Sequence, residues 1–240
     1  MSEPELSLVI PAYNEEARLG ATLQRVRRWL DARHLAAEIL VVDDGSTDRT
    51  AALAAAALDG IPGAVLGGEP NRGKGYAVRR GLLAARGRTV LITDADLSTP
   101  IEEHDRLADV MRRHELDVVI GSRALYGSQG QNPLRQLMGK TFNRIMRSMT
   151  GLPFQDTQCG FKLLDRAATH PIVERMVVDR FAFDVELLFL CGRAGLRVEE
   201  VPVVWRNAPG SKVSLFGDPV NMLWDVARLR WRHRRTRGGR

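Results

Sequence analysis

Short apolar runs alternate with amphipathic stretches over the first 120 residues of the chain. The clearest helical spacing, three or four residues between apolar positions, is that of Leu19, Leu23, Val26 and Leu30. Runs typical of strands cover residues 6–10, 38–42, 64–66, 89–93 and 117–120, and helical stretches cover about 15–33, 50–58, 76–86 and 101–113. This alternation predicts an α/β fold with a mainly parallel central sheet and helices on both faces.

The apolar run at 89–93 ends in two carboxylates, Asp94 and Asp96. Residues two apart in an extended chain point the same way, so both side chains can face one point beyond the strand. Such hard oxygen ligands suit Mg²⁺ or Mn²⁺ bridging a diphosphate. A simpler interpretation stays open, in which one aspartate only caps a helix that begins near Pro100.

Other predicted strands also end in polar residues: Tyr13, Asn14 and Glu15 after the first, Asp43 and Asp44 after the second, and Arg123 after the fifth. Ligands of open α/β sheets bind outside the carboxyl ends of the strands, so we expect a site there. Neither a dinucleotide-binding fingerprint nor a P-loop occurs, which indicates that a metal offsets phosphate charge. Asn14 is also predicted to cap the first helix, with Glu15 in its first turn.

Composition bounds the class of protein. The 240 residues are 44% hydrophobic and lack low-complexity tracts, so we expect one globular domain. The longest apolar run, Ala51–Leu58, is far shorter than the roughly 20 residues that span a bilayer, and residues 1–5 lack signal-peptide features. The sequence therefore predicts a cytoplasmic protein in which Cys159 and Cys191 are buried, reduced thiols.

Positive charge gathers at the C-terminus. Seven of the 35 basic residues are arginines within 228–240, where no acidic residue occurs. The rest of the chain has 28 basic and 29 acidic residues and is therefore nearly neutral. We expect residues 228–240 to form a basic tail after a domain that covers 1–227.

Two segments carry an apolar stripe with helical spacing beside basic residues. The stripes are Leu134, Met138, Phe142, Ile145 and Met149, and then Val220, Leu223, Trp224, Ala227 and Trp231. Each fits either a helix that lies on an anionic membrane surface or a helix that packs on the sheet. With the first alternative, the protein would be peripheral at the inner face of the membrane.

The chain resembles family 2 glycosyltransferases, because five segments occur in that family's order and spacing. They are Pro11–Glu15 (PAYNE), Val41–Asp48 (VVDDGSTD), Asn71–Gly75 (NRGKG), Asp94–Asp96 (DAD) and Gly121–Arg123 (GSR). Three later segments resemble the branch that transfers a sugar to a polyprenyl phosphate, and within it the dolichyl-phosphate β-glucosyltransferases: Asp156–Lys162 (DTQCGFK), Phe183–Leu188 (FDVELL) and Trp205–Lys212 (WRNAPGSK). The resemblance implies the nucleotide-diphospho-sugar transferase (GT-A) fold, with a nucleotide-sugar half at about 1–123 and an acceptor half at about 124–227.

The resemblance also implies a donor site for a nucleotide sugar. Residues that would line the nucleoside pocket are Pro11, Tyr13, Glu15 and Asp44. Within this set, Asp44 would accept a hydrogen bond from the uracil imide and Glu15 would hold ribose hydroxyls. Lys74, between two glycines that allow close backbone approach, would reach the nucleotide.

Charge on the departing diphosphate must be stabilised for the sugar to leave. By resemblance, Asp94 and Asp96 would hold Mg²⁺ or Mn²⁺, and Arg123 would pair with the diphosphate through its planar fork. Together the metal and the guanidinium would act as electrostatic catalysts.

The acceptor side of the site needs less catalysis. A lipid phosphate is already an anion near neutral pH, so a strong general base is not obligatory. By resemblance, Asp156 would orient the acceptor or relay a proton, and Arg206 and Lys212 would bind its phosphate. Asp184 and Glu186 lie in an apolar segment, so each is either an ion-pair or cap residue or a site residue; we interpret Glu186 as structural and leave Asp184 open.

Three functions fit the sequence. The first is inverting transfer of a hexose, expected to be glucose from UDP-glucose, to a polyprenyl phosphate. The second uses the same fold with a soluble or non-prenyl acceptor, or with GDP-mannose as donor. The third is a binding protein whose arginine-rich tail engages nucleic acid, and the acidic and basic residues at the strand ends argue against it.

Overall fold

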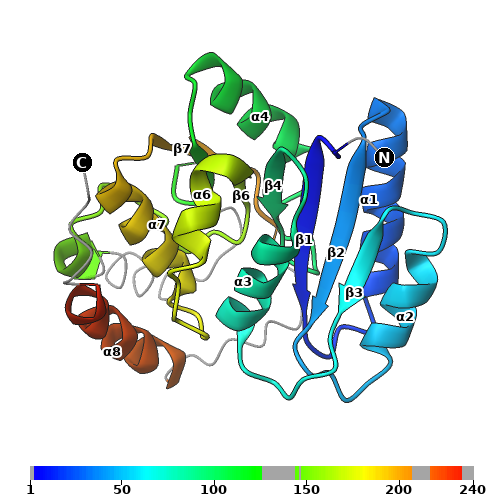
Figure 1. Cartoon of the computed structure of the whole chain (residues 1–240), viewed down its shortest axis with the longest axis horizontal. Coiled ribbons are helices and arrows are strands. Elements are labelled where there is room, and N and C mark those ends of the chain that lie inside the picture. The colour runs from blue at the N-terminus through cyan, green and yellow to red at the C-terminus, as the bar shows by residue number, and fades with distance from the viewer. Residues whose placement is uncertain (1–2, 126–143, 146, 207–216, 234–240) are drawn as a thin grey trace.

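The protein is an α/β domain. Its structure is a computed structural model that describes residues 3–125, 144–145, 147–206 and 217–233. Within these ranges seven strands form one sheet in the order β3-β2-β1-β4-β6-β5-β7 (Figure 1). Their bounds are β1 Leu6–Ala12, β2 Ala37–Asp43, β3 Gly63–Leu66, β4 Thr89–Ile92, β5 Val118–Ser122, β6 Lys162–Asp165 and β7 Val198–Pro202. Only β6 among them runs antiparallel to its neighbours, β4 and β5.

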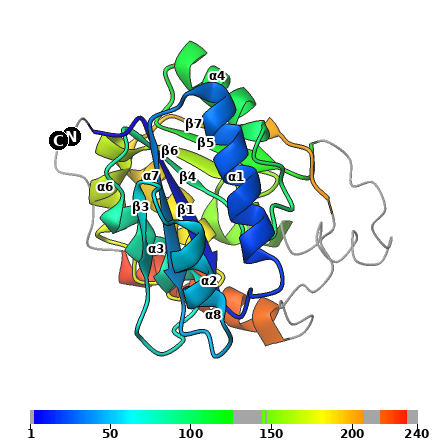
Figure 2. The ribbon, with the colours of Figure 1, turned by 90° about the vertical axis from the view of Figure 1, so that its right-hand side faces the viewer.

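Helices cover both faces of the sheet, as Figure 2 shows for α1 on one side and α3 and α6 on the other. One face carries α1 (Leu19–Arg33), α2 (Thr50–Ala57) and α4 (Glu103–Arg113). The opposite face carries α3 (Lys74–Ala84), α6 (Arg166–Val173), α7 (Phe183–Ala194) and α8 (Gly217–Arg232). The predicted mainly parallel sheet with helices on both faces is confirmed.

Strand residues alternate between two hydrophobic cores, which explains why the strands read as continuous apolar runs. In β2, Leu40 and Val42 face the core under α3 and α7, whereas Ile39 and Val41 face the core under α1. Each such side chain contributes about 1.5–3 kcal/mol by leaving water. Burial on both faces therefore fixes the strand register and, with it, the residues at the strand ends.

The predicted N-cap at Asn14 is wrong. Helix α1 begins at Leu19, and Asn14 lies in a left-handed turn with φ 52°. Its backbone N–H donates to Ser46 Oγ at 2.8 Å, and its side-chain oxygen accepts from the backbone of Thr47 at 2.8 Å. The loop after β1 is thus bonded to the loop after β2, a pairing between distant segments that local sequence does not reveal.

Helix α8 continues past the expected domain boundary at residue 227 and ends at Arg232. Met222, Val226 and Leu229 on its inner face are buried in the core beside α7. Trp224, 62% exposed, lies on its outer face. The helix therefore packs through Met222, Val226 and Leu229, with Leu223 of the predicted stripe partly buried beside them, whereas Trp224 of that stripe stays at the surface.

Most of the first predicted stripe, from Leu134 to Phe142, lies outside the described residues, whereas Ile145 is exposed and Met149 is partly buried against the core. In the described part of the chain, no helix has the length and apolar character needed to cross a membrane.

Both cysteines are buried, and burial raises the pKa of Cys159 to about 11 and of Cys191 to about 12.

Candidate active site

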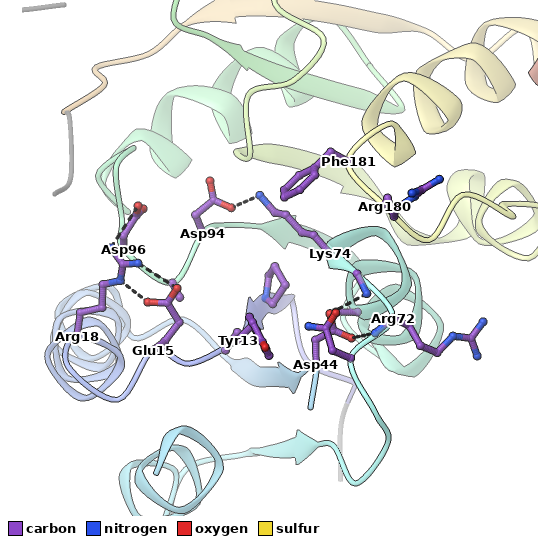
Figure 3. A pocket seen from close by; sticks show the side chains of 16 residues that line it. Tyr13, Glu15, Arg18, Asp44, Arg72, Lys74, Asp94, Asp96, Arg180 and Phe181 are labelled. Atoms are coloured by element: carbon purple, nitrogen blue, oxygen red, sulfur yellow. Dashed lines mark hydrogen bonds and ion pairs between the residues drawn. The ribbon is translucent and has the colours of Figure 1, made fainter. Parts of the chain in front are cut away.

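A cavity of about 460 Å³ lies at the carboxyl ends of β1, β2 and β4 (Figure 3). Seven residues that the sequence predicted for the donor site line it together: Pro11, Tyr13, Glu15, Asp44, Lys74, Asp94 and Asp96. The cavity also contains residues that the sequence did not predict, namely Arg18, Arg72, Arg180 and Phe181. Strand ends distant in sequence thus meet at one place, as expected for an open parallel sheet.

Asp44 fixes the glycine-rich turn on one wall of the cavity. Its carboxylate accepts from the backbone N–H groups of Arg72 at 3.0 Å and Gly73 at 2.8 Å. Gly73 has φ 117°, and a Cβ there would lie 2.6 Å from the carbonyl oxygen of Asp179. Only glycine fits this position, and the turn is held so that Lys74 points into the cavity.

Lys74 and Asp94 form an ion pair inside the cavity, with Nζ 2.5 Å from Oδ1. Burial opposes the charge of Asp94, but Lys74 outweighs it and holds the pKa of this carboxyl below its usual range. Gly160 borders the carboxylate so closely that a Cβ there would lie 2.2 Å from Oδ2. The glycine in the DTQCGFK segment therefore makes room for Asp94.

Asp96 lies on the other side of the cavity from Lys74 (Figure 3). Its Oδ1 accepts from the backbone of Ser98 at 2.9 Å, and its Oδ2 lies 4.0 Å from Arg18, which is bonded to Glu15. Helix α4 begins later, at Glu103, without a side-chain cap. The simpler interpretation of the aspartate pair as a helix cap is therefore wrong.

The two aspartates suit a divalent cation that also binds a ligand. Among the described residues no three His, Cys, Asp or Glu side chains gather as a metal cage. Mg²⁺ commonly uses one or two carboxylates and takes its other ligands from phosphates and water. Asp94 and Asp96 fit this pattern because both line the cavity, where a diphosphate could supply the remaining oxygens.

Arg123, directly after β5, forms a partly buried pair with Asp156. The guanidinium donates to both carboxylate oxygens, Nε to Oδ2 at 2.7 Å and Nη2 to Oδ1 at 2.8 Å, and the backbone N–H of Arg123 donates at 3.0 Å. Asp156 is 2% exposed, and although burial works against its charge, Arg123 keeps its pKa below the usual range. Neither Arg123 nor Asp156 is among the residues that line the cavity, but the charge of Arg123 is near enough to Asp94 to help keep the pKa of that carboxyl low.

A second buried pair, Lys162 with Asp184, lies behind the site. Lys162 is fully buried, and its ammonium donates to the Asp184 carboxylate and to the carbonyl oxygen of Cys159 at 2.5 Å. Its positive charge favours the ionised forms of Asp94 and Asp156. Lys162 was not predicted from the sequence as a site residue, although it is the last residue of the DTQCGFK segment.

Glu186 has a structural position, as the sequence analysis interpreted it. Its carboxylate accepts from the backbone of Val178 at 2.9 Å and lies 2.9 Å from Nε2 of His233, at the end of α8. Arg206 is not among the residues that line the cavity, and its backbone N–H donates to the carbonyl oxygen of Ser98 at 2.7 Å. Lys212 lies outside the described residues.

The model of the family described as glycosyl transferase family 2 matches residues 7–172. Curated relatives include dolichyl-phosphate β-glucosyltransferases from Dictyostelium discoideum, 35% identical over 95% of this chain and 74% of the relative, and from Saccharomyces cerevisiae, 32% identical over 94% and 74%. The human dolichyl-phosphate β-glucosyltransferase is 31% identical over 95% of this chain and 76% of its own length.

Solved structures share the fold. Glucosyl-3-phosphoglycerate synthase from Mycobacterium tuberculosis in complex with UDP has a TM-score of 0.68 at 22% identity, over 95% of this chain and 80% of that one. Mannosyl-3-phosphoglycerate synthase from Rubrobacter xylanophilus has a TM-score of 0.70 at 22% identity, over 98% and 74%. The mycobacterial enzyme is also known with Mn²⁺ and UDP-glucose, at a TM-score of 0.64 and 23% identity over 95% and 79%.

These likenesses confirm the expected GT-A fold. The family match spans β1 to α6, and so it includes every strand end that borders the cavity as well as the Arg123–Asp156 pair. The chain is a glycosyltransferase that belongs to glycosyl transferase family 2, in the branch represented by the dolichyl-phosphate β-glucosyltransferases.

Proposed function

We propose that the chain transfers glucose from UDP-glucose to a polyprenyl phosphate, with inversion at the anomeric carbon. The observation that carries this proposal is the cavity lined by Asp94 and Asp96, with the Arg123–Asp156 pair near enough for the charges of Arg123 and Asp94 to attract each other. The relatives named above, which are dolichyl-phosphate β-glucosyltransferases, support the choice of sugar and of a lipid phosphate as acceptor.

The nucleoside would lie against Pro11 and Tyr13, and Asp44 of the same cavity would contact its base. Asp44 already accepts two backbone N–H groups, yet its two carboxylate oxygens keep further lone pairs for the uracil imide. Glu15 would accept from ribose hydroxyls while it stays paired with Arg18. The diphosphate would then extend toward Asp94, Asp96 and Arg123.

Arg123 would stabilise the departing UDP. Its guanidinium is held by Asp156 along one edge, so it is oriented before the donor arrives and needs little reorganisation during the reaction. Asp94 and Asp96 would hold Mg²⁺ or Mn²⁺, which supplies positive charge to the diphosphate oxygens. Lys74, now bonded to Asp94, lies where its ammonium could move to a phosphate oxygen.

The acceptor phosphate would attack without a strong base. One of its oxygens forms a bond to the anomeric carbon as the bond from that carbon to the UDP oxygen breaks, and UDP leaves with the electron pair. Because Arg123 keeps the pKa of Asp156 low, this carboxylate is a weak proton acceptor near neutral pH. That suits an acceptor that is already an anion, and it leaves Asp156 an orienting role.

Helix α8 supports a reaction at a membrane surface. Trp224 is exposed, and the guanidinium of Arg228 lies 4.9 Å from the centre of its ring. An exposed tryptophan beside arginines is typical of helices that lie on anionic lipid. We propose that the outer face of α8, together with the arginines of residues 234–240, binds the surface that carries the lipid acceptor.

The acceptor proposal is tested by incubating the chain with radiolabelled UDP-glucose and Mg²⁺ in three mixtures: polyprenyl phosphate in vesicles, 3-phosphoglycerate, and no acceptor. We expect label in the organic phase with the lipid alone. Label on 3-phosphoglycerate instead would favour the soluble-acceptor alternative.

The donor proposal is tested by calorimetry with UDP and GDP. The pocket at Asp44 should favour UDP, and GDP binding as tightly as UDP would overturn the assignment.

A further inference from the structure

The strand β7 carries a glutamate that reaches the turn on which Asp156 lies. β7 pairs in parallel with β5, and Glu200 is the register partner of Ile120, three residues before Arg123. The Glu200 carboxylate accepts from the backbone N–H of Gln155 at 2.7 Å and from that of Asp156 at 2.7 Å. The segment before β6 is thus held to β7 by two charge-assisted hydrogen bonds.

These hydrogen bonds form a series that ends at Arg123. Glu200 holds the backbone of Asp156, and the Asp156 carboxylate holds the backbone and guanidinium of Arg123. Arg123 carries its charge beside the cavity, close enough to Asp94 for the two opposite charges to attract each other. Glu200 itself is absent from the residues that line the cavity and has no described contact with it. Its influence on Arg123 must therefore pass through Asp156.

We propose that Glu200 is a positioning residue for glycosyl transfer, which fixes Asp156 so that Arg123 keeps its orientation toward the diphosphate. This inference rests on the proposed function. A displacement near 1 Å of a catalytic group can slow a reaction about 100-fold. Since Arg123 would act on charge that develops as UDP leaves, losing the orientation should lower kcat and leave the KM for UDP-glucose nearly unchanged.

The chain offers a matched control in the neighbouring residue. Glu199 lies on the same strand, and its carboxylate lies 2.6 Å from Nδ1 of the exposed His114. Glu199 has no described bond to the segment 155–156. A variant at Glu199 therefore makes the same change of charge on β7 without touching Asp156.

The experiment compares Glu200→Ala, Glu200→Gln and Glu199→Ala in the full chain, with labelled UDP-glucose and polyprenyl phosphate. We expect kcat to fall 10- to 100-fold in Glu200→Ala and less in Glu200→Gln, whose amide oxygen still accepts one hydrogen bond. Glu199→Ala should stay within twofold of the wild type. The stoichiometry of UDP binding, measured by calorimetry, should be the same in all four proteins, which separates misplacement from unfolding.

Hydrogen exchange adds a readout that does not need activity. Peptides that contain Gln155 and Asp156 should exchange about tenfold faster or more in Glu200→Ala than in the wild type or in Glu199→Ala. If the wild type is active and kcat is unchanged in Glu200→Ala, the inference about Glu200 is wrong and the proposed function stands. The same conclusion follows if kcat falls equally in Glu200→Ala and Glu199→Ala. A wild type that binds UDP but transfers no glucose would overturn the proposed function and the positioning role of Glu200 with it.

Discussion

Arg123 and Asp156 form a pair that stabilises the fold and that we propose also serves the chemistry. Asp156 is almost fully buried and makes three hydrogen bonds to Arg123, so the ionised form is the native one. Its lowered pKa stabilises the fold at every pH above the value for the unfolded chain, near 3.9. That contribution is lost as pH falls through the still lower pKa of the folded protein.

Asp156→Asn should therefore lower the free energy of unfolding by about 2 kcal/mol at neutral pH, less than for a fully enclosed pair because the Arg123 side chain is 34% exposed. The difference from the wild type should stay constant above about pH 5 and shrink below about pH 4. Denaturant unfolding at several pH values measures it. A difference that grows in acid would contradict the assigned ionisation of Asp156.

Metal dependence is a prediction about Asp94 and Asp96. Transfer should require Mg²⁺ or Mn²⁺ and stop in excess EDTA, because the diphosphate charge would otherwise meet two carboxylates. Asp96→Ala should abolish turnover but shift Tm by only about 2–4 °C, since it removes one hydrogen bond from the backbone N–H of Ser98 and a partly exposed ion pair with Arg18 at 4.0 Å. Circular dichroism checks the fold, and full activity in EDTA would refute the metal role.

The buried Lys162–Asp184 pair should show strong coupling. Lys162→Met leaves the Asp184 carboxylate buried without its main partner and should cost about 3–5 kcal/mol of stability. The double variant Lys162→Met, Asp184→Leu removes both charges and should be less destabilised than Lys162→Met alone. Denaturant melts of the single and double variants measure the coupling, and additive losses would show that the two side chains act independently.

Among the elements, α8 pairs with a residue that lines the cavity and also reaches the outer surface of the molecule. Arg180, which lines the cavity, has its guanidinium 3.7 Å from the carboxylate of Asp225 on α8. The same helix is buried through Leu229, and His233 just beyond its end is buried against Glu186. A truncation after residue 227 would remove part of the core, so the surface must be tested by changes that leave residues up to 233 in place.

Deleting residues 234–240 removes four arginines, each worth on the order of 1 kcal/mol near an anionic surface. If half of them act, affinity for anionic vesicles should fall about 30-fold, and Trp224→Ser should weaken the part that salt does not screen. Vesicle sedimentation measures both effects, with neutral vesicles and Arg112→Ser on α4 as controls. Unchanged sedimentation of both α8-side variants would exclude this surface as the membrane contact.

Helices and strands with a clear pattern of apolar residues could be predicted from the sequence. Features whose conformation depends on residues distant in the chain could not. The strands before Asp44, Asp94 and Arg123 could be predicted from their apolar runs, because a strand buried on both faces of a sheet needs apolar residues at nearly every position. The antiparallel strand β6 was not predicted, since it pairs with residues 70 to 76 positions away in β4 and 42 to 46 positions away in β5. The same limit applies to Asn14, whose partners are in the loop after β2.

At the scale of the whole molecule, the sheet brings the residues that follow β1, β2 and β4 to one edge, where they line the cavity. The buried Lys162 lies near them, and its charge favours the ionised form of Asp94. Sequence patterns could place Asp94, Asp96 and Arg123 at that edge, because parallel strands share their carboxyl ends. They could not reveal that Lys74 pairs with Asp94 or that Arg123 pairs with Asp156. Such pairings depend on side-chain contacts across the sheet, and these follow only from the folded geometry.

The most direct test of the account is the initial rate of glucose transfer from UDP-glucose to polyprenyl phosphate by the wild type and by Asp156→Asn, with Mg²⁺ and with UDP affinity measured in parallel. We predict a lipid product from the wild type and a rate at least about 100-fold lower from the variant, with UDP affinity changed less than threefold. No lipid product from a wild type that binds UDP, or equal rates for the two proteins, would contradict the account.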